Sequence, residues 1–280
     1  MGKIKPAILC PNCGKLISAN TKECIHCGMK NPGGFGIHSY LQRIFRGQLD
    51  FIKIVIFICV GLFVFSLLLD PASISLYPGF FSFLSPGDGS LWRLGMTGAH
   101  AMAHKHWWTL ITAIYLHGGL MHIVFNMLWI RQIGPMVEEL FGTARFIIIF
   151  TAAGVLGYII SNQLSGNWTI GASGSVFGLF GALIYYGRSR GGRFGDMIYR
   201  QLLIWAVIGF IFGFVYPGIN NFAHLGGFIG GYLAANLLGY QEKKSENYWH
   251  RLAAGVIMLL TILAFVLVIL FPTPLPNQFF

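Results

Sequence analysis

Residues 221–231 read NFAHLGGFIGG, and residues 171–181 read GASGSVFGLFG. Each stretch carries small residues three or four positions apart: Ala223, Gly227 and Gly231 in the first, Gly174, Gly178 and Gly181 in the second. Such stripes let two helix backbones approach closely inside a membrane. The two stretches therefore predict a tightly packed pair of membrane helices, with Ser173 near the start of one and His224 near the start of the other.

The composition of the whole chain also points to a membrane protein. Of 280 residues, 55% are hydrophobic and only 10% are charged, whereas a soluble domain carries roughly 25% charged residues. So few charges cannot cover a water-exposed surface, so we expect an all-α polytopic membrane protein. At roughly 20 residues per span, the apolar segments predict seven helices: 51–69, 109–130, 144–163, 172–187, 199–216, 221–239 and 252–271.

The basic residues predict how these helices cross the membrane. Lysine and arginine favour cytoplasmic loops, and 17 of the 19 fall in alternate loops of the seven-span arrangement, beginning with the N-terminal segment. This pattern predicts a cytoplasmic N-terminus and a C-terminus on the outside of the cell membrane. The net charge of +10 then reflects topology, and no nucleic-acid partner is needed to explain it. Because the first apolar segment follows fifty polar and basic residues, we expect a retained anchor and no cleaved signal peptide.

A cysteine pattern marks the N-terminal segment. Four cysteines are spaced as CxxC-x10-CxxC: Cys10, Cys13, Cys24 and Cys27. Four thiolates satisfy a closed structural zinc site, and about thirty residues need a metal to fold. A redox pair or disulfides are the alternatives, but a reducing cytoplasm argues against disulfides. We therefore expect a Zn²⁺ ribbon, in which His26 is a bystander, while Cys59 in the first apolar span is a buried small hydrophobe.

These features divide the chain into four parts. Residues 1–30 form the predicted zinc ribbon, which could bind a cytosolic partner. Residues 31–50 form a linker, in which residues 38–48 are either a basic amphipathic helix on the membrane surface or plain linker. Residues 51–240 form the helical core. Residues 241–280 add a cytoplasmic loop, the seventh helix and a short outer tail.

Polar residues inside the predicted spans are the candidates for function, because ionisable side chains are costly in hydrocarbon. His122 and Asn126 in the second span are four residues apart and share one helix face. His117 lies closer to the outer end of that span. Ser173 and His224 lie at the starts of the fourth and sixth spans, which also begin at the outer face. All five therefore could line one hollow in the outer-leaflet half of the membrane.

These residue types suit acyl-transfer chemistry. A serine hydroxyl is a weak nucleophile until a neighbouring imidazole takes its proton, and histidine titrates near neutrality. His122, Asn126 and the Ser173 backbone N–H are donors able to hold an oxyanion. The seven spans contain no Asp or Glu to orient His224, so Ser173 and His224 would act as a dyad.

The pattern HxxxxHxxxN, then GxSG, then AHxxGxxxG, each in a membrane span, resembles the signature of rhomboid intramembrane serine proteases. The likeness covers residues 50–240, includes the segment IGPMVEELFG at 133–142, and resembles the six-plus-one variant of the family. It implies Ser173 as nucleophile and His224 as general base, with no catalytic cofactor. It also implies His122, Asn126 and the Ser173 N–H as oxyanion donors, and transmembrane proteins in the bilayer as substrates. The supporting positions that it implies are His117, Gly171 and Gly174.

Two positions depart from the family pattern. The family often has Trp-Arg nine residues before the first histidine, but this chain has Trp108-Thr109, so the anchoring of the outer loop is expected to differ. Many members have a tyrosine four residues after the serine, stacked beneath the base. Phe177 stands there, and its ring could stack without supplying a hydroxyl.

Other readings of the same residues stay open. Each polar residue taken alone fits a role in helix packing. A rhomboid-like pseudoprotease would bind membrane helices without cutting them, although Ser173 and His224 are intact. A transporter or proton channel would use His117, His122 and His224 as a relay, but it would be expected to carry carboxylates in its spans. A serine-directed fluorophosphonate probe separates these readings.

Overall fold

The computed structural model describes residues 7–10, 15–26, 28, 32, 50–76 and 82–274. The predicted surface helix at 38–48, Cys13 and Cys27 lie outside them. The described part is mostly helical and contains one small hairpin. Its elements are β1 (Ala7–Leu9), β2 (Leu16–Ser18), α2 (Phe51–Leu69), η2 (Pro71–Ser73), α3 (Asp88–Arg93), α4 (Ala99–Ala103), α5 (Thr109–Thr112), η3 (Ala113–Tyr115), α6 (Leu120–Phe141), α7 (Thr143–Leu164), α8 (Ser173–Arg190), α9 (Gly192–Val215), α10 (Asn221–Leu238) and α11 (Tyr248–Leu270).

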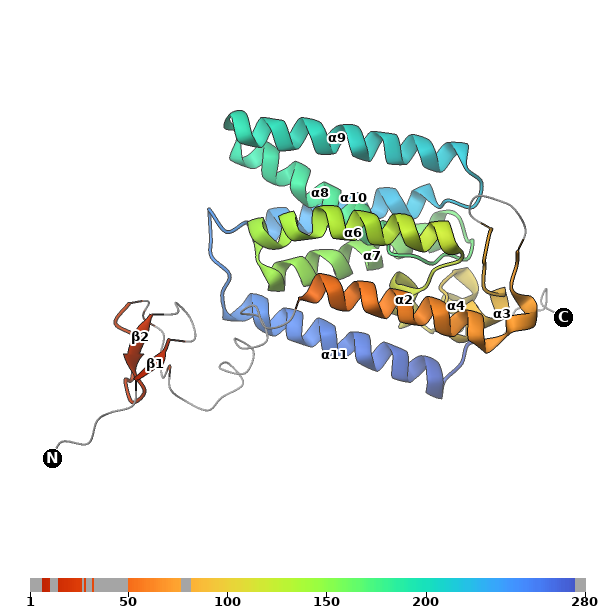
Figure 1. Cartoon of the computed structure of the whole chain (residues 1–280), viewed down its shortest axis with the longest axis horizontal. Coiled ribbons are helices and arrows are strands. Elements are labelled where there is room, and N and C mark those ends of the chain that lie inside the picture. The colour runs from red at the N-terminus through yellow and green to blue at the C-terminus, as the bar shows by residue number, and fades with distance from the viewer. Residues whose placement is uncertain are drawn as a thin grey trace.

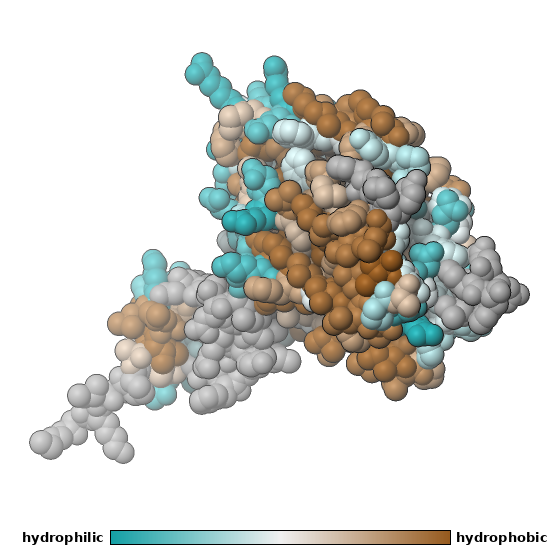
Figure 2. All heavy atoms as spheres, turned by 45° about the vertical axis from the view of Figure 1, so that its right-hand side comes forward, coloured by the Kyte–Doolittle hydropathy of each residue, from teal (hydrophilic) through white to brown (hydrophobic). Residues whose placement is uncertain are grey.

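The long helices form a bundle whose surface is strongly apolar. Figure 1 shows α9 and α11 along opposite edges, with α6, α8 and α10 between them. Hydrophobic side chains cover much of the face drawn in Figure 2, as expected where lipid replaces water. In the described part, α2, α7, α9 and α11 are long and apolar enough to cross a membrane. A fifth span results if α6 is counted together with the short helical segment before it, Thr109–Tyr115.

The interior helices α8 and α10 fall below that test, although both were predicted as spans. They carry many glycines and several polar residues, and nearly every residue of α8 from Gly174 to Gly187 is buried against other helices. A helix covered by protein does not need the hydrophobicity of one that faces lipid. The multi-pass character of the protein is therefore confirmed, whereas hydropathy alone supports four or five of the seven predicted spans.

The prediction of one continuous second span at 109–130 was wrong. The chain forms α5 and η3 over Thr109–Tyr115, breaks, and resumes as α6 at an angle of 92°. The break holds two consecutive glycines, Gly118 and Gly119, which are poor helix formers. The Ala113 carbonyl accepts a hydrogen bond from the distant Gly171 N–H at 2.9 Å. His117 consequently lies in the break and not on the face of a helix.

The predicted glycine packing between α8 and α10 is confirmed. A Cβ built on Gly231 would run into the Gly178 carbonyl, and one on Gly227 would run into the carbonyl of Gly174. On the neighbouring side of α10, a Cβ on Gly226 would lie 2.9 Å from the Cα of Gly157 in α7. Only glycine therefore allows α10 to sit between α7 and α8 at these distances.

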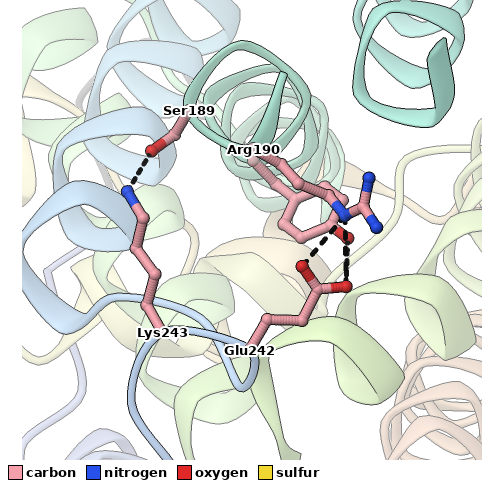
Figure 3. Close-up of polar contacts among 5 residues, drawn as sticks. Ser189, Arg190, Glu242 and Lys243 are labelled. Carbon is pink, nitrogen blue, oxygen red and sulfur yellow. Dashed lines mark hydrogen bonds and ion pairs between the residues drawn. The ribbon is translucent and has the colours of Figure 1, made fainter. Parts of the chain in front are cut away.

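A polar cluster fastens the loop after α10 to the end of α8 (Figure 3). Arg190 Nε lies 2.9 Å from Glu242 Oε2, and Lys243 Nζ donates to Ser189 Oγ at 2.8 Å. The Tyr186 hydroxyl donates to Glu242 Oε1 at 3.2 Å. Because Arg190 and Glu242 are both partly exposed, their ion pair contributes at most about 1 kcal/mol. Its main consequence is to hold the loop after α10 against the end of α8.

Arg145 is fully buried in the first turn of α7. Its guanidinium donates to the carbonyls of Lys244 at 2.7 Å and Ser245 at 3.1 Å. Its backbone N–H donates to Glu246 Oε1 at 3.0 Å. Arg145 thus joins the start of α7 to the loop before α11, and these partners are about a hundred residues away in sequence.

Candidate active site

One cavity of about 590 Å³ collects most of the predicted functional residues. It lies among α6, α8, α9 and α10, under the segments that precede α6, α8 and α10. Ser173, His224, His122 and Asn126 all line it. Three supporting positions, His117, Gly171 and Gly174, are absent from its described lining. The serine and the two histidines therefore share one hollow, although they come from three different helices.

Ser173 is the first residue of α8, and the turn before it is tightly held. Gly171 has φ +114°, a conformation that side chains disfavour. Its carbonyl accepts a hydrogen bond from the buried Tyr158 hydroxyl at 2.5 Å. Because Ser173 occupies the first helical position, its N–H has no carbonyl partner within the helix. This N–H is therefore available as a donor near the serine hydroxyl.

His224 is held by the N-terminal cap of α10. Asn220 Oδ1 accepts the Ala223 N–H at 3.1 Å, as a capping asparagine does. The Asn220 carbonyl accepts the His224 N–H at 3.2 Å, and Asn220 Nδ2 donates to Ser161 Oγ of α7 at 2.5 Å. Asn220 thus ties the turn that carries His224 to a neighbouring helix.

Two contacts bring the serine and histidine segments together. A Cβ built on Gly174 would lie 3.3 Å from the carbonyl oxygen of Ala223, so the residue after Ser173 lies against the residue before His224. The ring of Phe177, one turn after Ser173, stacks on the His224 imidazole at 4.2 Å with an interplanar angle of 16°. The phenyl ring therefore takes the stacking position expected for the family's tyrosine, without a hydroxyl.

His122 and Asn126 lie on one face of α6, as their spacing predicted. The Gly118 N–H donates to His122 Nδ1 at 3.3 Å, which places the ring proton of a neutral imidazole on Nε2. That nitrogen faces Gly171, where a Cβ would lie 2.5 Å from it. Asn126 Nδ2 donates to the His122 carbonyl at 2.8 Å, so one of its two N–H groups remains. The cavity thus receives N–H donors from both residues.

His117 is fully buried, and neither ring nitrogen has a hydrogen-bond partner among the described residues. Its ring meets the edge of His122 at 5.1 Å and 63°. A buried polar group without a partner costs free energy. In this structure, the contact of His117 with the site is its ring, which packs against His122.

Thr109, which replaces the family's arginine, is fully buried. Its hydroxyl lies 2.7 Å from the His106 carbonyl and 3.1 Å from Thr97 Oγ1. Asn162 Nδ2 of α7 donates to the same Thr97 oxygen at 3.1 Å. Two threonines and an asparagine therefore anchor the outer loop here.

The cavity wall includes aromatic residues that sequence reasoning missed. Trp129 of α6 and Trp205 of α9 meet at 5.4 Å, and Phe125 and Phe212 of the same helices meet at 6.4 Å. The spacing of Phe125 and Trp129 places them on one helix face, but a sequence does not show which helix faces them. The described lining contains no Asp or Glu. The arrangement therefore offers a hydroxyl, an imidazole and N–H donors inside an apolar hollow.

The N-terminal hairpin holds two of the four predicted metal ligands. β1 and β2 pair antiparallel with Ile8 opposite Ile17, and Cys10 and Cys24 are buried beside Ile17. The Gly28 N–H donates to the Cys24 carbonyl at 2.9 Å, and Gly28 has φ +70°. Three or more candidate ligands do not meet anywhere in the described residues, which exclude Cys13 and Cys27. The two described thiols therefore lie in one small buried cluster with Ile17.

Comparison with known proteins identifies the helical core. The Rhomboid domain matches residues 104–241. The chain is 38% identical to "Rhomboid protease GluP" of Bacillus subtilis over 158 residues, which are 56% of this chain and 31% of that protein. It is 33% identical to the rhomboid relative YdcA of the same organism over 56% of this chain and 80% of that protein. It is 25% identical to "Rhomboid-like protease 3" of Toxoplasma gondii over 79% of this chain and 82% of that protein.

The extent of these matches differs between relatives. The aligned segment spans under a third of GluP but most of YdcA. The matched domain begins at residue 104 and ends at 241, so it contains the cavity residues of α6, α8 and α10. The printed names of GluP and of the Toxoplasma relative describe those proteins as rhomboid proteases.

Proposed function

The chain belongs to the rhomboid family, and from this premise we propose that it is an intramembrane serine endopeptidase with Ser173 and His224 as its catalytic dyad. The observation that carries the proposal is that Ser173 and His224 line the same cavity. Ser173 lies at the start of α8, and His224 lies at the start of α10. The contact of Gly174 with Ala223 shows that the two helix starts that carry Ser173 and His224 lie against each other.

The proposed reaction begins when Ser173 Oγ attacks a peptide carbonyl and His224 accepts the hydroxyl proton. His224 then gives that proton to the departing amine, and the acyl group stays on Ser173. Water, deprotonated by His224, releases the acyl group and restores the serine. Phe177, stacked on the imidazole, keeps the ring in place between the two proton transfers. No carboxylate takes part, consistent with the described lining of the cavity.

The oxyanion formed in each attack would be held by three donors. These are His122 Nε2–H, the remaining N–H of Asn126 and the Ser173 backbone N–H. The Gly118 N–H on His122 Nδ1 supports the tautomer that this role needs. Donors fixed before the reaction stabilise the charge without reorganisation, which is why such sites act strongly in a water-poor cavity.

The proposed substrates are transmembrane segments of other membrane proteins. A helix hides its peptide carbonyls in its own hydrogen bonds, so a substrate has to unwind locally before Ser173 can reach a carbonyl. Small or helix-breaking residues near the cleaved bond would favour this step. The apolar wall of the cavity suits such an unwound but hydrophobic segment.

The proposed topology has the N-terminus in the cytoplasm, the C-terminus outside and the cavity in the outer-leaflet half. It rests on the distribution of lysine and arginine among the loops. Thiol-reactive probes that cannot cross the membrane would test it in cells. A cysteine introduced at half-exposed Ser165 would react from outside, whereas one at half-exposed Ser189 would stay protected.

We also propose a zinc ribbon over residues 1–30, a linker over 31–50, a protease core over 51–240 and the seventh helix within 241–280. The ribbon would bind Zn²⁺ through Cys10, Cys13, Cys24 and Cys27, and the burial of Cys10 and Cys24 in one cluster supports this set. The ion would stabilise a unit too small to fold on a hydrophobic core. A cytosolic partner for the ribbon is part of the same proposal.

A fluorophosphonate probe tests the dyad. We expect the purified protein to be labelled and the Ser173→Ala variant to lose the label. Ser175→Ala is the matched control, since Ser175 lies on the same helix but faces Gly154 of α7 from a buried position. Loss of labelling in Ser175→Ala with retention in Ser173→Ala would refute the assignment. No labelling of the folded wild type would favour a pseudoprotease.

A further inference from the structure

The segment that follows α11 folds back onto the loop that precedes α5. Both lie at the same end of the bundle, where Figure 1 shows the end of α11 near α3 and α4. The indole N–H of Trp92 donates to two carbonyls of this segment, Thr273 at 3.2 Å and Pro274 at 3.0 Å. Trp92 is 1% exposed, so these bonds form in the interior and not on a solvated surface.

Two histidines of the same loop add to the contact. His100 Nε2 lies 3.1 Å from the Pro274 carbonyl, and His106 Nδ1 lies 2.7 Å from Thr273 Oγ1. Since a carbonyl only accepts, His100 Nε2 is a donor here. The ring of Trp108 also meets Phe271 at 6.4 Å. Residues 271–274 are therefore held by side chains from three places along the outer loop.

Trp92 connects this contact to the wall of the cavity. Its ring lies 5.7 Å from that of Trp168, and Trp168 lines the cavity. Met96 packs in the same buried cluster as Trp92 and lines the cavity too. The backbone of Thr97, next to Met96, pairs with Thr169 of the wall. The Trp92 indole therefore makes two contacts. Its N–H donates to the segment after α11, and its ring packs against Trp168 of the cavity wall.

The dyad depends on different contacts. Ser173 and His224 are held by the glycine packing of α8 on α10 and by the Asn220 cap. None of the described hydrogen bonds of residues 271–274 reaches α8 or α10. Residues 271–274 thus contact the loop beside the cavity wall and make none of these hydrogen bonds to the helices that carry the dyad.

We propose that residues 271–274 form a strap that, through Trp92, positions the Met96 and Trp168 wall of the cavity for substrate binding. The inference rests on the proposed protease function and names Trp92 as a positioning residue. A transmembrane substrate extends on both sides of the cleaved peptide bond, so part of it has to lie along this wall. A small phosphonate needs only the serine, the base and the oxyanion donors. Loosening the strap would therefore weaken binding of the long substrate and leave the chemistry of the dyad intact.

The test compares Trp92→Phe with Trp107→Phe in the full-length protein. Phenylalanine keeps a ring against Trp168 but removes both hydrogen bonds to the strap. Trp107 is in the same loop and 70% exposed, so it controls for the change of residue type. For a transmembrane reporter in proteoliposomes, we expect Trp92→Phe to raise KM about five- to tenfold, with kcat unchanged. The rate of fluorophosphonate labelling should stay at the wild-type value.

A second variant covers the case in which the buried Trp92→Phe protein does not fold. His100→Ala removes a donor from a half-exposed side chain and should raise KM in the same direction by a smaller factor. Unchanged KM in both variants, or in His100→Ala alone if Trp92→Phe is unfolded, would overturn the strap. A parallel loss of labelling and kcat would also overturn it, because the dyad would then depend on this contact. A wild-type protein that neither labels nor cleaves would instead remove the proposed function.

Discussion

His122 has the most specific local environment of the proposed oxyanion donors. The Gly118 N–H fixes its tautomer, and the positive-φ glycine at 171 leaves room for Nε2. We expect His122→Ala to lower kcat for a transmembrane reporter about 10²- to 10³-fold with little change in KM, because the donor acts on charge that develops in the transition state. An unfolding curve that matches the wild type is the control. A rate within twofold of wild type would remove His122 from the oxyanion site.

The residue scale is also where sequence reasoning was strongest. The spacing of His122 and Asn126 predicted a shared face, and Ser173 and His224 were expected to meet in one hollow, which they line together. What could not be predicted was how each is held. The Tyr158 hydroxyl on the Gly171 carbonyl and the Asn220 link to Ser161 join residues distant in sequence, and no local pattern reveals such partners.

At the scale of elements, glycine determines how α8 and α10 pack. A Cβ on Gly231 would clash with the backbone of Gly178, which cannot move like the tip of a side chain. We expect Gly231→Ala to lower the free energy of unfolding by about 1–3 kcal/mol and to lower activity because the helices separate. Gly61→Ala on α2 is the control, since a Cβ there meets no atom within 4 Å. Equal melting temperatures for the two variants would contradict this account of the packing.

The strap that follows α11 should depend on pH through His106, which lies outside the membrane-spanning helices. Burial, and then the neighbouring His104, lowers the pKa of His106 below its usual 6.5. The closed strap thus favours neutral His106, so its stabilisation is complete above about pH 6.5 and is lost as pH falls through the lowered pKa. In the same loop, His100 packs against His104, and Lys105 directly precedes His106 in the chain.

The measurement is the melting temperature of wild type and His106→Gln between about pH 7.5 and pH 5. Glutamine keeps a polar contact to Thr273 but does not titrate. The wild type should lose more stability on acidification than the variant, since only the wild type must exclude a proton at this position. Parallel curves would show that His106 carries none of the pH dependence.

Among the elements, the break in the second predicted span shows the limit of hydropathy. Residues 109–130 are apolar enough to pass for one helix, yet the chain turns by 92° before α6. The two glycines at 118 and 119 were visible in the sequence. The partner of the Ala113 carbonyl, the Gly171 N–H, was not. The burial of Arg145 was missed for the same reason, because its acceptors are backbone carbonyls that no residue pattern encodes.

For the whole molecule, the proposed zinc ribbon should be separable from the protease core. We expect one zinc ion per chain by elemental analysis of the purified protein, falling below about one tenth in Cys24→Ser. The control is Cys59→Ala, which changes a buried thiol of α2. This variant should still contain one zinc ion per chain. Because the cavity lies among α6, α8, α9 and α10, reporter cleavage should survive the loss of the metal. Wild-type protein free of zinc, with both cysteine pairs reduced, would refute the ribbon.

The arrangement of the whole bundle explains why weakly hydrophobic helices can carry the chemistry. α8 and α10 hold the polar and glycine residues and are covered by protein, while α2, α9 and α11 expose large apolar side chains. The sequence predicted seven helices, and the positions of α2 and α10 agree with the prediction to within one residue. The aromatic cavity wall was not predictable, because it depends on which faces of α6 and α9 meet.

The central claim is that one hydroxyl and one imidazole, brought together by α8 and α10, cut a peptide bond within the membrane. The most direct measurement is cleavage of a transmembrane reporter in proteoliposomes by wild type, Ser173→Ala, His224→Ala and the control Ser175→Ala. The account predicts cleavage by the wild type and the control, and no cleavage above background by the other two. Cleavage by Ser173→Ala or His224→Ala at the wild-type rate would contradict it.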